Sequence, residues 1–194
     1  MNRLDLIAGP NGAGKSTFVE LTLAPLLKGS VFVNADEIAK DRWPKEPSAH
    51  AYEAAVIAAE TRETLIRAGR SFIAETVFSH PSKLELIDAA HAAGYTVVLH
   101  VLLIPEELAV ARVAYRVRAG GHPVAQDKIR QRYHRLWPLV AEAISRCEQA
   151  TVYDNSALTG PRIVAQMAEG FIVGAPDWPG WAPQPLTTRW PLTS

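Results

Sequence analysis

Residues 9–16 read Gly-Pro-Asn-Gly-Ala-Gly-Lys-Ser and match the phosphate-binding pattern G-x-x-x-x-G-K-[ST] without a gap. The apolar residues Leu4–Ala8 just before them predict a buried strand, and a helical pattern follows from Lys15 to about Leu27. In such a turn, glycines let backbone N–H groups point at phosphate oxygens, and the helix N-terminus adds partial positive charge. The residues that we expect to contact a nucleotide are Gly9, Pro10, Asn11, Gly12, Ala13, Gly14, Lys15, Ser16 and Thr17.

Two side chains of this loop carry specific tasks. Lys15 is expected to reach the β- and γ-phosphates, and the Ser16 hydroxyl is expected to ligate Mg²⁺. The predicted cofactors are therefore ATP and Mg²⁺. A chance glycine turn before a helix is the alternative, but the spacing, the strand and the helix all agree with the nucleotide loop.

The rest of the chain alternates short apolar runs with longer helical patterns. Besides the first strand, we expect strands at about 31–34, 71–76, 96–104 and 151–154. The further helices are expected at about 48–68, 82–93, 105–119, 125–149 and 162–169. This alternation predicts an α/β P-loop fold, with a five-stranded, mostly parallel sheet and helices on both faces.

Composition limits the function and the location of the protein. The 194 residues contain 20 Lys and Arg and 20 Asp and Glu, and a zero net charge argues against a dedicated nucleic-acid binder. The single cysteine, Cys147, fits a reducing compartment. Since no apolar run reaches the roughly 20 residues of a membrane-spanning helix, we expect a cytoplasmic protein without a membrane segment.

Polar residues follow two of the predicted strands, where the carboxyl ends of parallel strands form binding sites. Asp36 is a candidate to accept the proton of an attacking hydroxyl, or else it caps the helical turn that follows it. Glu75 and Thr76 are candidates to hold acceptor hydroxyls. In a second interpretation, Glu75 binds Mg²⁺ through a water molecule. In a third, Glu75 and Thr76 are polar residues at a strand end whose hydrogen bonds are satisfied within the protein.

The segment from residue 105 to residue 135 is basic, with seven Lys or Arg residues against three acidic ones. The glycine pair Gly120-Gly121 divides it into two helical patterns that are free to hinge. We interpret it as a lid whose arginines close over the triphosphate and exclude water. A pair of solvated amphipathic helices is the alternative.

Taken together, several stretches resemble the zeta-toxin-domain family of P-loop kinases, in its compact bacterial branch. They are GPNGAGKST (9–17), NADEIA (34–39), FIAET (72–76), VVLHVLLIP (97–105), ARVAYRVRAGGHPV (111–124), IRQRYHRLWPL (129–139) and VYDNS (152–156). The resemblance runs from about residue 4 to residue 155. With the change of composition at residue 174, we expect a kinase-like domain at 1–173, with its lid at about 105–135, and a tail at 174–194 that is rich in Pro and Trp.

The resemblance also implies roles for individual residues. Asp36 matches the catalytic aspartate of the family, while Glu75 and Thr76 fall in the acceptor pocket. Arg116 and Arg132 match the lid arginines that clamp phosphates and act with Lys15 in catalysis. Asn155 lies where kinases of this shape hold the nucleotide base.

The expected function is ATP-dependent phosphate transfer to a hydroxyl of a small molecule. The resemblance implies a sugar nucleotide such as UDP-N-acetylglucosamine as the acceptor, and an antitoxin protein as a candidate partner. The alternatives are a toxin component that an antitoxin neutralises and a module that binds or hydrolyses ATP without kinase activity.

Overall fold

The computed structural model describes residues 2–119 and 124–192. Its strands are β1 (Asn2–Ala8), β2 (Val31–Val33), β3 (Phe72–Thr76), β4 (Tyr95–Leu103), β5 (Gln149–Asp154), β6 (Arg162–Ala168) and β7 (Phe171–Ile172). Its helices are α1 (Lys15–Phe18), a π-helical turn (Val19–Leu23), α2 (Ala24–Leu26), α3 (Ala35–Arg42), α4 (Ala51–Arg67), α5 (Ser82–Ala92), α6 (Glu106–Arg118), α7 (Gln126–Arg146) and α8 (Gln184–Arg189).

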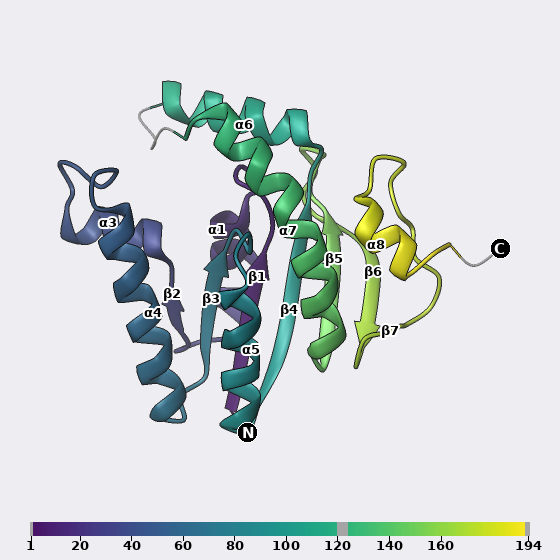
Figure 1. The fold of residues 1–194 in the computed structure, drawn as a ribbon, viewed down its shortest axis with the longest axis horizontal. Coiled ribbons are helices and arrows are strands. Elements are labelled where there is room, and N and C mark those ends of the chain that lie inside the picture. The colour runs from purple at the N-terminus through teal and green to yellow at the C-terminus, as the bar shows by residue number, and fades with distance from the viewer. Residues whose placement is uncertain (1, 120–123, 193–194) are drawn as a thin grey trace.

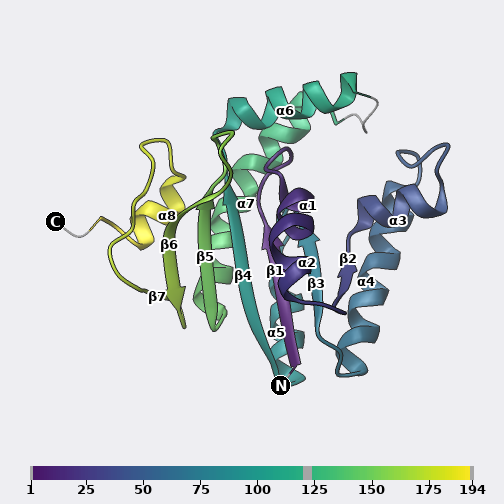
Figure 2. The same ribbon diagram turned by 180° about the vertical axis from the view of Figure 1, so that it is seen from behind.

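A single sheet organises the described residues, in the order β2-β3-β1-β4-β5-β6-β7. The first five of these strands run parallel to one another, whereas β6 pairs antiparallel with β5 and β7 pairs antiparallel with β6. Helices α4, α5 and α7 cover the face seen in Figure 1, and α1 and α2 lie on the opposite face seen in Figure 2. The predicted α/β fold with a mostly parallel sheet is therefore confirmed.

Strands β1 and β4 form the centre of the sheet because both of their faces are covered. Every residue from Val97 to Ile104, the position just after β4, is at most 6% exposed. The one polar residue of this stretch, His100, contacts the Asp5 carboxylate of β1 at 3.0 Å, and Arg3 also binds that carboxylate. Burying a charge is costly unless it is paired, and these contacts supply the pairing.

Two of our predictions about the end of the chain are wrong. The sheet has seven strands rather than five, and residues 162–169 form strand β6 instead of a short helix. Some residues of this stretch favour helices, but the stretch forms a strand because it pairs with β5, for example between Thr151 and Gln166. Val164 and Met167 are buried on the core side of β6, which is the gain that favours the strand.

The tail after β7 returns to the body of the protein. Trp178, Leu186 and Trp190 are all part of the main hydrophobic core. The Trp178 indole donates a hydrogen bond to the Trp190 carbonyl at 2.8 Å, and the Trp190 indole donates one to the Gly170 carbonyl at 2.9 Å. Buried tryptophans normally find such partners for their N–H groups, and both of these do.

We expect Trp190→Ala to lower the free energy of unfolding by about 3–5 kcal/mol, because it removes a large buried side chain and leaves a cavity. Leu192→Ala is the control, since Leu192 is 63% exposed and should change stability little. Urea unfolding followed by circular dichroism measures both. Equal unfolding midpoints for the two variants would show that the tail contributes nothing to stability.

Candidate active site

The phosphate-binding loop lies between β1 and α1 and is enclosed on two sides. Gly12 and Gly14 have φ angles of 78° and 81°, which side-chain-bearing residues rarely adopt. A Cβ on Gly12 would lie 2.9 Å from the Ala109 carbonyl oxygen of α6, and one on Gly14 would lie 2.8 Å from the Asn155 amide nitrogen. The loop therefore needs glycine both for its conformation and for these close approaches.

Lys15 stands at the start of α1 and is 7% exposed. Its ammonium group donates a hydrogen bond to the Pro10 carbonyl at 3.0 Å. Burial lowers the pKa of Lys15, while the nearby Glu75 and Asp36 charges act to raise it. The arginines of the lid segment, Arg116 and Arg132, lower it further. The structure thus brings the carboxylates and the arginines predicted from the sequence within electrostatic reach of one lysine.

Glu75, at the end of β3, links the ends of three neighbouring strands. The Ser16 hydroxyl donates to Glu75 Oε2 at 2.8 Å, and the Asn34 amide donates to the same oxygen at 2.6 Å. Lys15 Nζ lies 3.9 Å from Glu75 Oε1. A hydroxyl and a carboxylate are hard oxygen ligands that suit Mg²⁺, so Ser16 and Glu75 fit the ion that would accompany ATP.

Asp36 is the second residue of α3, and it does not cap that helix. The cap is Asn34, whose side-chain oxygen accepts a hydrogen bond from the Asp36 backbone N–H at 2.7 Å. The alternative in which Asp36 serves as the cap is therefore wrong. Its side chain is exposed and lines the large cleft of the protein. Arg132, on α7, lies close enough for the Asp36 charge to act on its pKa.

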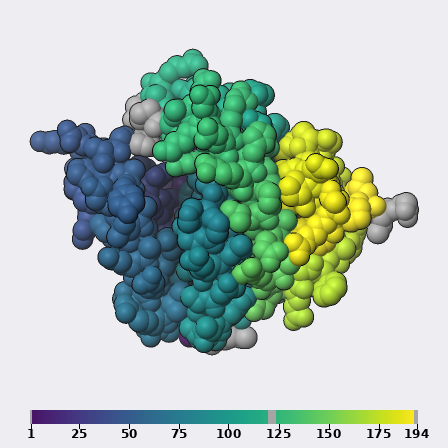
Figure 3. All heavy atoms as spheres, in the orientation of Figure 1, coloured from purple at the N-terminus to yellow at the C-terminus, as the bar shows by residue number. Residues whose placement is uncertain are grey.

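That cleft has a volume of about 810 Å³ and lies between the α3–α4 side and the α6–α7 side. Figure 3 shows the hollow between these helix pairs, with the N-terminal segment in purple at its floor. Its carboxylates are Asp36, Glu37 and Glu75. Its cations are Lys15, Lys40, Arg62, Lys83, Arg112, Arg116, Lys128 and Arg132. This excess of positive charge suits a polyanion such as a nucleotide triphosphate.

The arginines of the lid segment fall into different groups. Arg116 and Arg132 line the cleft, as expected of phosphate clamps. Arg112 also lines it, but its guanidinium donates to the Asn155 and Ser156 carbonyls at 3.0 and 3.2 Å and so ties α6 to the loop after β5. The glycine hinge at 120–121 lies outside the described residues.

Arg130 joins the two helices of the lid segment to each other. It contacts Glu106 at 3.0 Å and Glu107 at 2.6 Å, and these carboxylates raise the pKa of Arg130. The Tyr133 hydroxyl donates to the Ile104 carbonyl at 3.0 Å, which fixes the early part of α7 on the end of β4. Both helices are therefore anchored where they meet the sheet.

Two of the predicted site residues brace the backbone. The Asn155 amide donates to the Ala13 carbonyl of the phosphate loop at 2.7 Å. The Thr76 hydroxyl oxygen accepts from the backbone N–H of Phe78 at 3.1 Å and lies in the lining of the cleft. Phe78 has a φ of 64°, so Thr76 helps to hold the sharp turn after β3.

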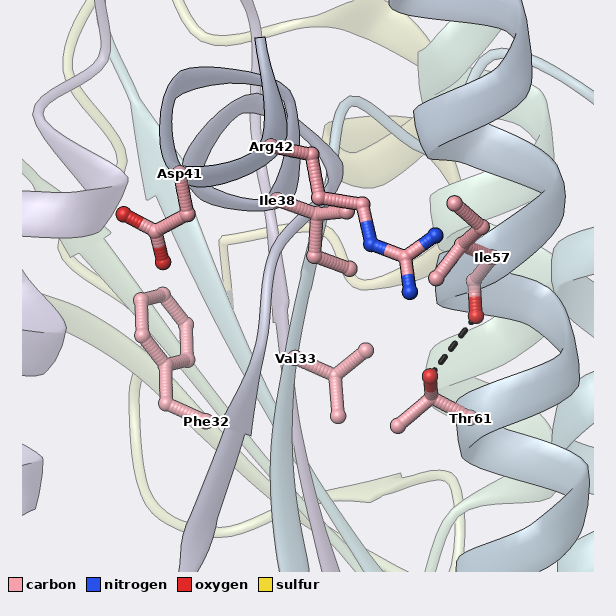
Figure 4. A pocket seen from close by; sticks show the side chains of 7 residues that line it. All are labelled: Phe32, Val33, Ile38, Asp41, Arg42, Ile57 and Thr61. Atoms are coloured by element: carbon pink, nitrogen blue, oxygen red, sulfur yellow. Dashed lines mark hydrogen bonds between the residues drawn. The ribbon is translucent and has the colours of Figure 1, made fainter. Parts of the chain in front are cut away.

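A second, smaller cavity of about 270 Å³ lies under α3 and α4 at the β2 edge of the sheet. Figure 4 shows its largely apolar wall of Phe32, Val33, Ile38 and Ile57, with Thr61 donating a hydrogen bond to the Ile57 carbonyl. It shares no lining residue with the large cleft, which holds the residues of the phosphate loop. We therefore place the candidate active site in the large cleft.

Sequence reasoning missed several parts of this site. It treated Asn34 only as part of a motif, although the Asn34 side chain makes hydrogen bonds with the Asp36 backbone and with the Glu75 carboxylate. It also gave no role to Lys40, Arg62 or Lys83. Lys40 lies on α3, which was not among the predicted helices, while Arg62 and Lys83 lie on helices that were predicted. Among the described residues, no helix is both long and apolar enough to cross a membrane.

Comparison with known proteins agrees with this geometry. The zeta toxin family model matches residues 2–159. A protein of Haemophilus influenzae, described only as an uncharacterized protein, is 28% identical over 133 residues, which are 68% of this chain and 93% of that protein.

Solved structures share the fold at low identity. The complex of AvrRxo1-ORF1 and -ORF2 with ATP aligns with a TM-score of 0.65 at 14% identity, over 89% of this chain and 60% of that chain. A structure from the PezAT chromosomal toxin–antitoxin system of Streptococcus pneumoniae gives 0.65 at 15% identity, over 86% and 72% of the two chains. The protein thus spans well under two thirds of the AvrRxo1 chain that it matches. The fold is that of P-loop kinases, and because the family model covers most of the chain, the protein belongs to the zeta toxin family.

Proposed function

We propose that the protein is an ATP-dependent kinase that phosphorylates a hydroxyl of a small molecule. The observation that carries the proposal is that Lys15, Asp36, Glu75, Arg116 and Arg132 all line one cleft together with the phosphate loop. Kinase catalysis depends mainly on positioning and on charge stabilisation, and this arrangement supplies both. Family membership supports the same reading.

The proposed reaction is an in-line transfer. The acceptor oxygen attacks the γ-phosphorus, the bond to the β–γ bridging oxygen breaks, and ADP leaves. The hydroxyl proton passes to the Asp36 carboxylate. Lys15 binds the β- and γ-phosphates, and Arg116 and Arg132 stabilise the charge on the transferring group. Asn155 keeps the loop in shape through Ala13 rather than holding the base.

Mg²⁺ bound with the nucleotide would neutralise part of the phosphate charge. In our proposal Ser16 would hold the ion directly and Glu75 would hold it through water. The hydrogen bond from Ser16 to Glu75 supports this assignment, and it favours the magnesium role of Glu75 over contact with the acceptor. Thr76 keeps its proposed role in the pocket that binds the acceptor.

The likeness to toxin–antitoxin structures supports a second proposal, that an antitoxin protein binds this chain and controls the kinase. It also keeps a sugar nucleotide such as UDP-N-acetylglucosamine among the acceptors to be tested. Co-purification with the product of a neighbouring small gene tests the partner. Transfer of labelled phosphate from ATP to a panel of hydroxyl compounds tests the acceptor.

Asp36→Asn should lower kcat by about 100-fold or more while ATP binding persists, because the amide cannot accept the proton. Asp41→Asn is a matched control on the same helix, since Asp41 lies outside the large cleft. Phosphate transfer and calorimetric ATP binding measure the two effects. A parallel loss of binding and turnover in Asp36→Asn would mean that Asp36 has a structural role.

Asn34→Ser should separate the two hydrogen bonds of Asn34. Serine keeps a capping oxygen for α3 but has no amide to hold Glu75, so we expect near-normal stability with reduced turnover. Asn34→Ala loses both bonds and should also lower the free energy of unfolding by about 1 kcal/mol. Thermal unfolding and kinase assays measure these effects. Full activity of Asn34→Ser would show that the bond to Glu75 is unimportant for transfer.

Nucleotide affinity should fall as the pH rises through the alkaline range. Burial holds the pKa of Lys15 below its ordinary 10.5 in the free protein, and a bound triphosphate would raise that pKa. Binding therefore takes up a proton at Lys15 and weakens when this proton is lost. Titrations of an ATP analogue between neutral and alkaline pH measure the trend, and Lys15→Arg, which stays charged, should flatten it. If the affinity of the wild-type protein for the ATP analogue did not depend on pH, this assignment of Lys15 would be contradicted.

A further inference from the structure

The loop that joins β3 to α5 forms part of the wall of the large cleft and is held in a strained turn. Residues 77–80 all line the cleft, and Phe78 has a φ of 64°, which bulky residues rarely adopt. The Phe78 side chain is fully buried, and the Thr76 hydroxyl oxygen holds its backbone N–H at 3.1 Å. Strained backbone persists only where its surroundings enforce it, and it is concentrated at functional sites, so this turn is a candidate for a role in the reaction.

His80 ends the turn, and its hydrogen bonds fix which ring nitrogen carries the proton. The backbone N–H of Ser82 donates to His80 Nδ1 at 3.2 Å, and the Ser82 hydroxyl lies 2.9 Å from the same nitrogen. Because a backbone N–H can only donate, Nδ1 of the neutral ring must accept and therefore carries no proton. The proton of the neutral imidazole is then on Nε2, which becomes a hydrogen-bond donor.

This Nε2 donor is available to a ligand. Within residues 2–119 and 124–192, Nε2 makes no hydrogen bond or ion pair, and His80 is exposed in the lining of the cleft. The loop behind it is fixed, since the Lys83 backbone N–H donates to the His80 carbonyl at 3.1 Å. The cleft therefore contains an N–H donor whose ring and backbone are both held by hydrogen bonds.

The order of the strands places this donor on the same side of the phosphate loop as the proposed base. Asp36 follows β2 and His80 follows β3, which are neighbours in the order β2-β3-β1-β4-β5. Asn155 follows β5, on the other side of β1 and its phosphate loop. Because Asp36 and His80 both line the cleft, a compound whose hydroxyl reaches Asp36 lies on the side of the cleft that carries His80.

We propose that His80 is a specificity-determining residue of the acceptor site, and that its Nε2–H donates a hydrogen bond to a second oxygen of the acceptor. The substrate is then a hydroxyl compound with at least one further oxygen that accepts a hydrogen bond, and a simple alkyl alcohol is a poor substrate. A site built to bond such an oxygen discriminates against an analogue that lacks it, because its donor is left unpaired. This inference rests on the proposed kinase function.

Two substitutions separate the local hydrogen bond of His80 from its Nε2 donor. In His80→Asn, the side-chain oxygen can accept from the backbone N–H two residues on, as in an Asx turn, but the shorter side chain removes the donor. In His80→Gln, the amide extends about as far as Nε2 and keeps a donor there, without the bond to Ser82. We therefore expect His80→Asn to retain the thermal unfolding midpoint and His80→Gln to retain more of the substrate affinity.

The kinetic experiment measures transfer of labelled phosphate from ATP to UDP-N-acetylglucosamine, free sugars and nucleosides. For each compound that the wild-type protein phosphorylates, we expect KM to rise about tenfold or more in His80→Asn and less in His80→Gln. The affinity for a non-hydrolysable ATP analogue should be unchanged in both variants. If His80 only supported the fold, KM would instead follow the unfolding midpoint, and His80→Gln would be the more impaired variant.

Deoxy analogues of a phosphorylated sugar or nucleoside then locate the oxygen that His80 contacts. At one position, loss of the oxygen should raise the KM of the wild-type protein about as much as His80→Asn does. The same loss should leave the KM of His80→Asn nearly unchanged, because the hydrogen bond is already absent. Nitrogen NMR spectra of the neutral His80 ring test the tautomer without any turnover.

Equal KM values in the wild-type protein and His80→Asn would overturn the proposal while the kinase function stands. The same response of both proteins to every deoxy analogue would do so too, as would a proton on Nδ1 of the neutral ring. If the wild-type protein phosphorylates no compound of the panel, the kinase function fails and the acceptor role of His80 fails with it. The two failures are therefore distinguishable.

Discussion

The carboxylate of Glu75 is the contact on which the site depends. One of its oxygens accepts hydrogen bonds from Ser16 and Asn34, and the other faces Lys15. Lys15 and Ser16 follow β1, Asn34 follows β2 and Glu75 belongs to β3, and these strands are neighbours in the order β2-β3-β1. A partly buried carboxylate is stable only when such donors surround it. It therefore joins the phosphate loop, the Ser16 hydroxyl and the start of α3 to one another.

The opposite wall is held by contacts of another kind. Helix α6 approaches the loop so closely at Gly12 that a Cβ has no room there, and Arg112 bonds the loop after β5. Arg130 and Tyr133 then hold α7 on α6 and on β4. Arg116 and Arg132 line the cleft from helices whose ends near the sheet are anchored in this way.

The phosphate loop, the parallel core and the place of Asp36 at the end of β2 could be predicted from the sequence, because each depends on neighbouring residues. A loop motif needs only its own spacing, and a buried parallel strand is visible as a short apolar run. The strand at 162–168 was not predicted, because its residues also favour a helix and its strand conformation depends on antiparallel pairing with β5, which helix propensity does not register. The packing of the tail, by contrast, could be expected from its tryptophans, and Trp178 and Trp190 are buried in the main hydrophobic core.

By itself, then, the sequence determined the nucleotide loop with Lys15 and Ser16, the parallel α/β core and a basic helical segment near the loop. Only the tertiary structure decided which side chains meet. It gave the helix cap to Asn34 rather than to Asp36, bound Arg112 to backbone carbonyls after β5, and placed Arg132 in the lining of the cleft. The reason is physical. Hydrogen bonds and charge pairs depend on distances of a few ångströms between residues far apart in the chain, and the packing of the sheet and helices sets those distances.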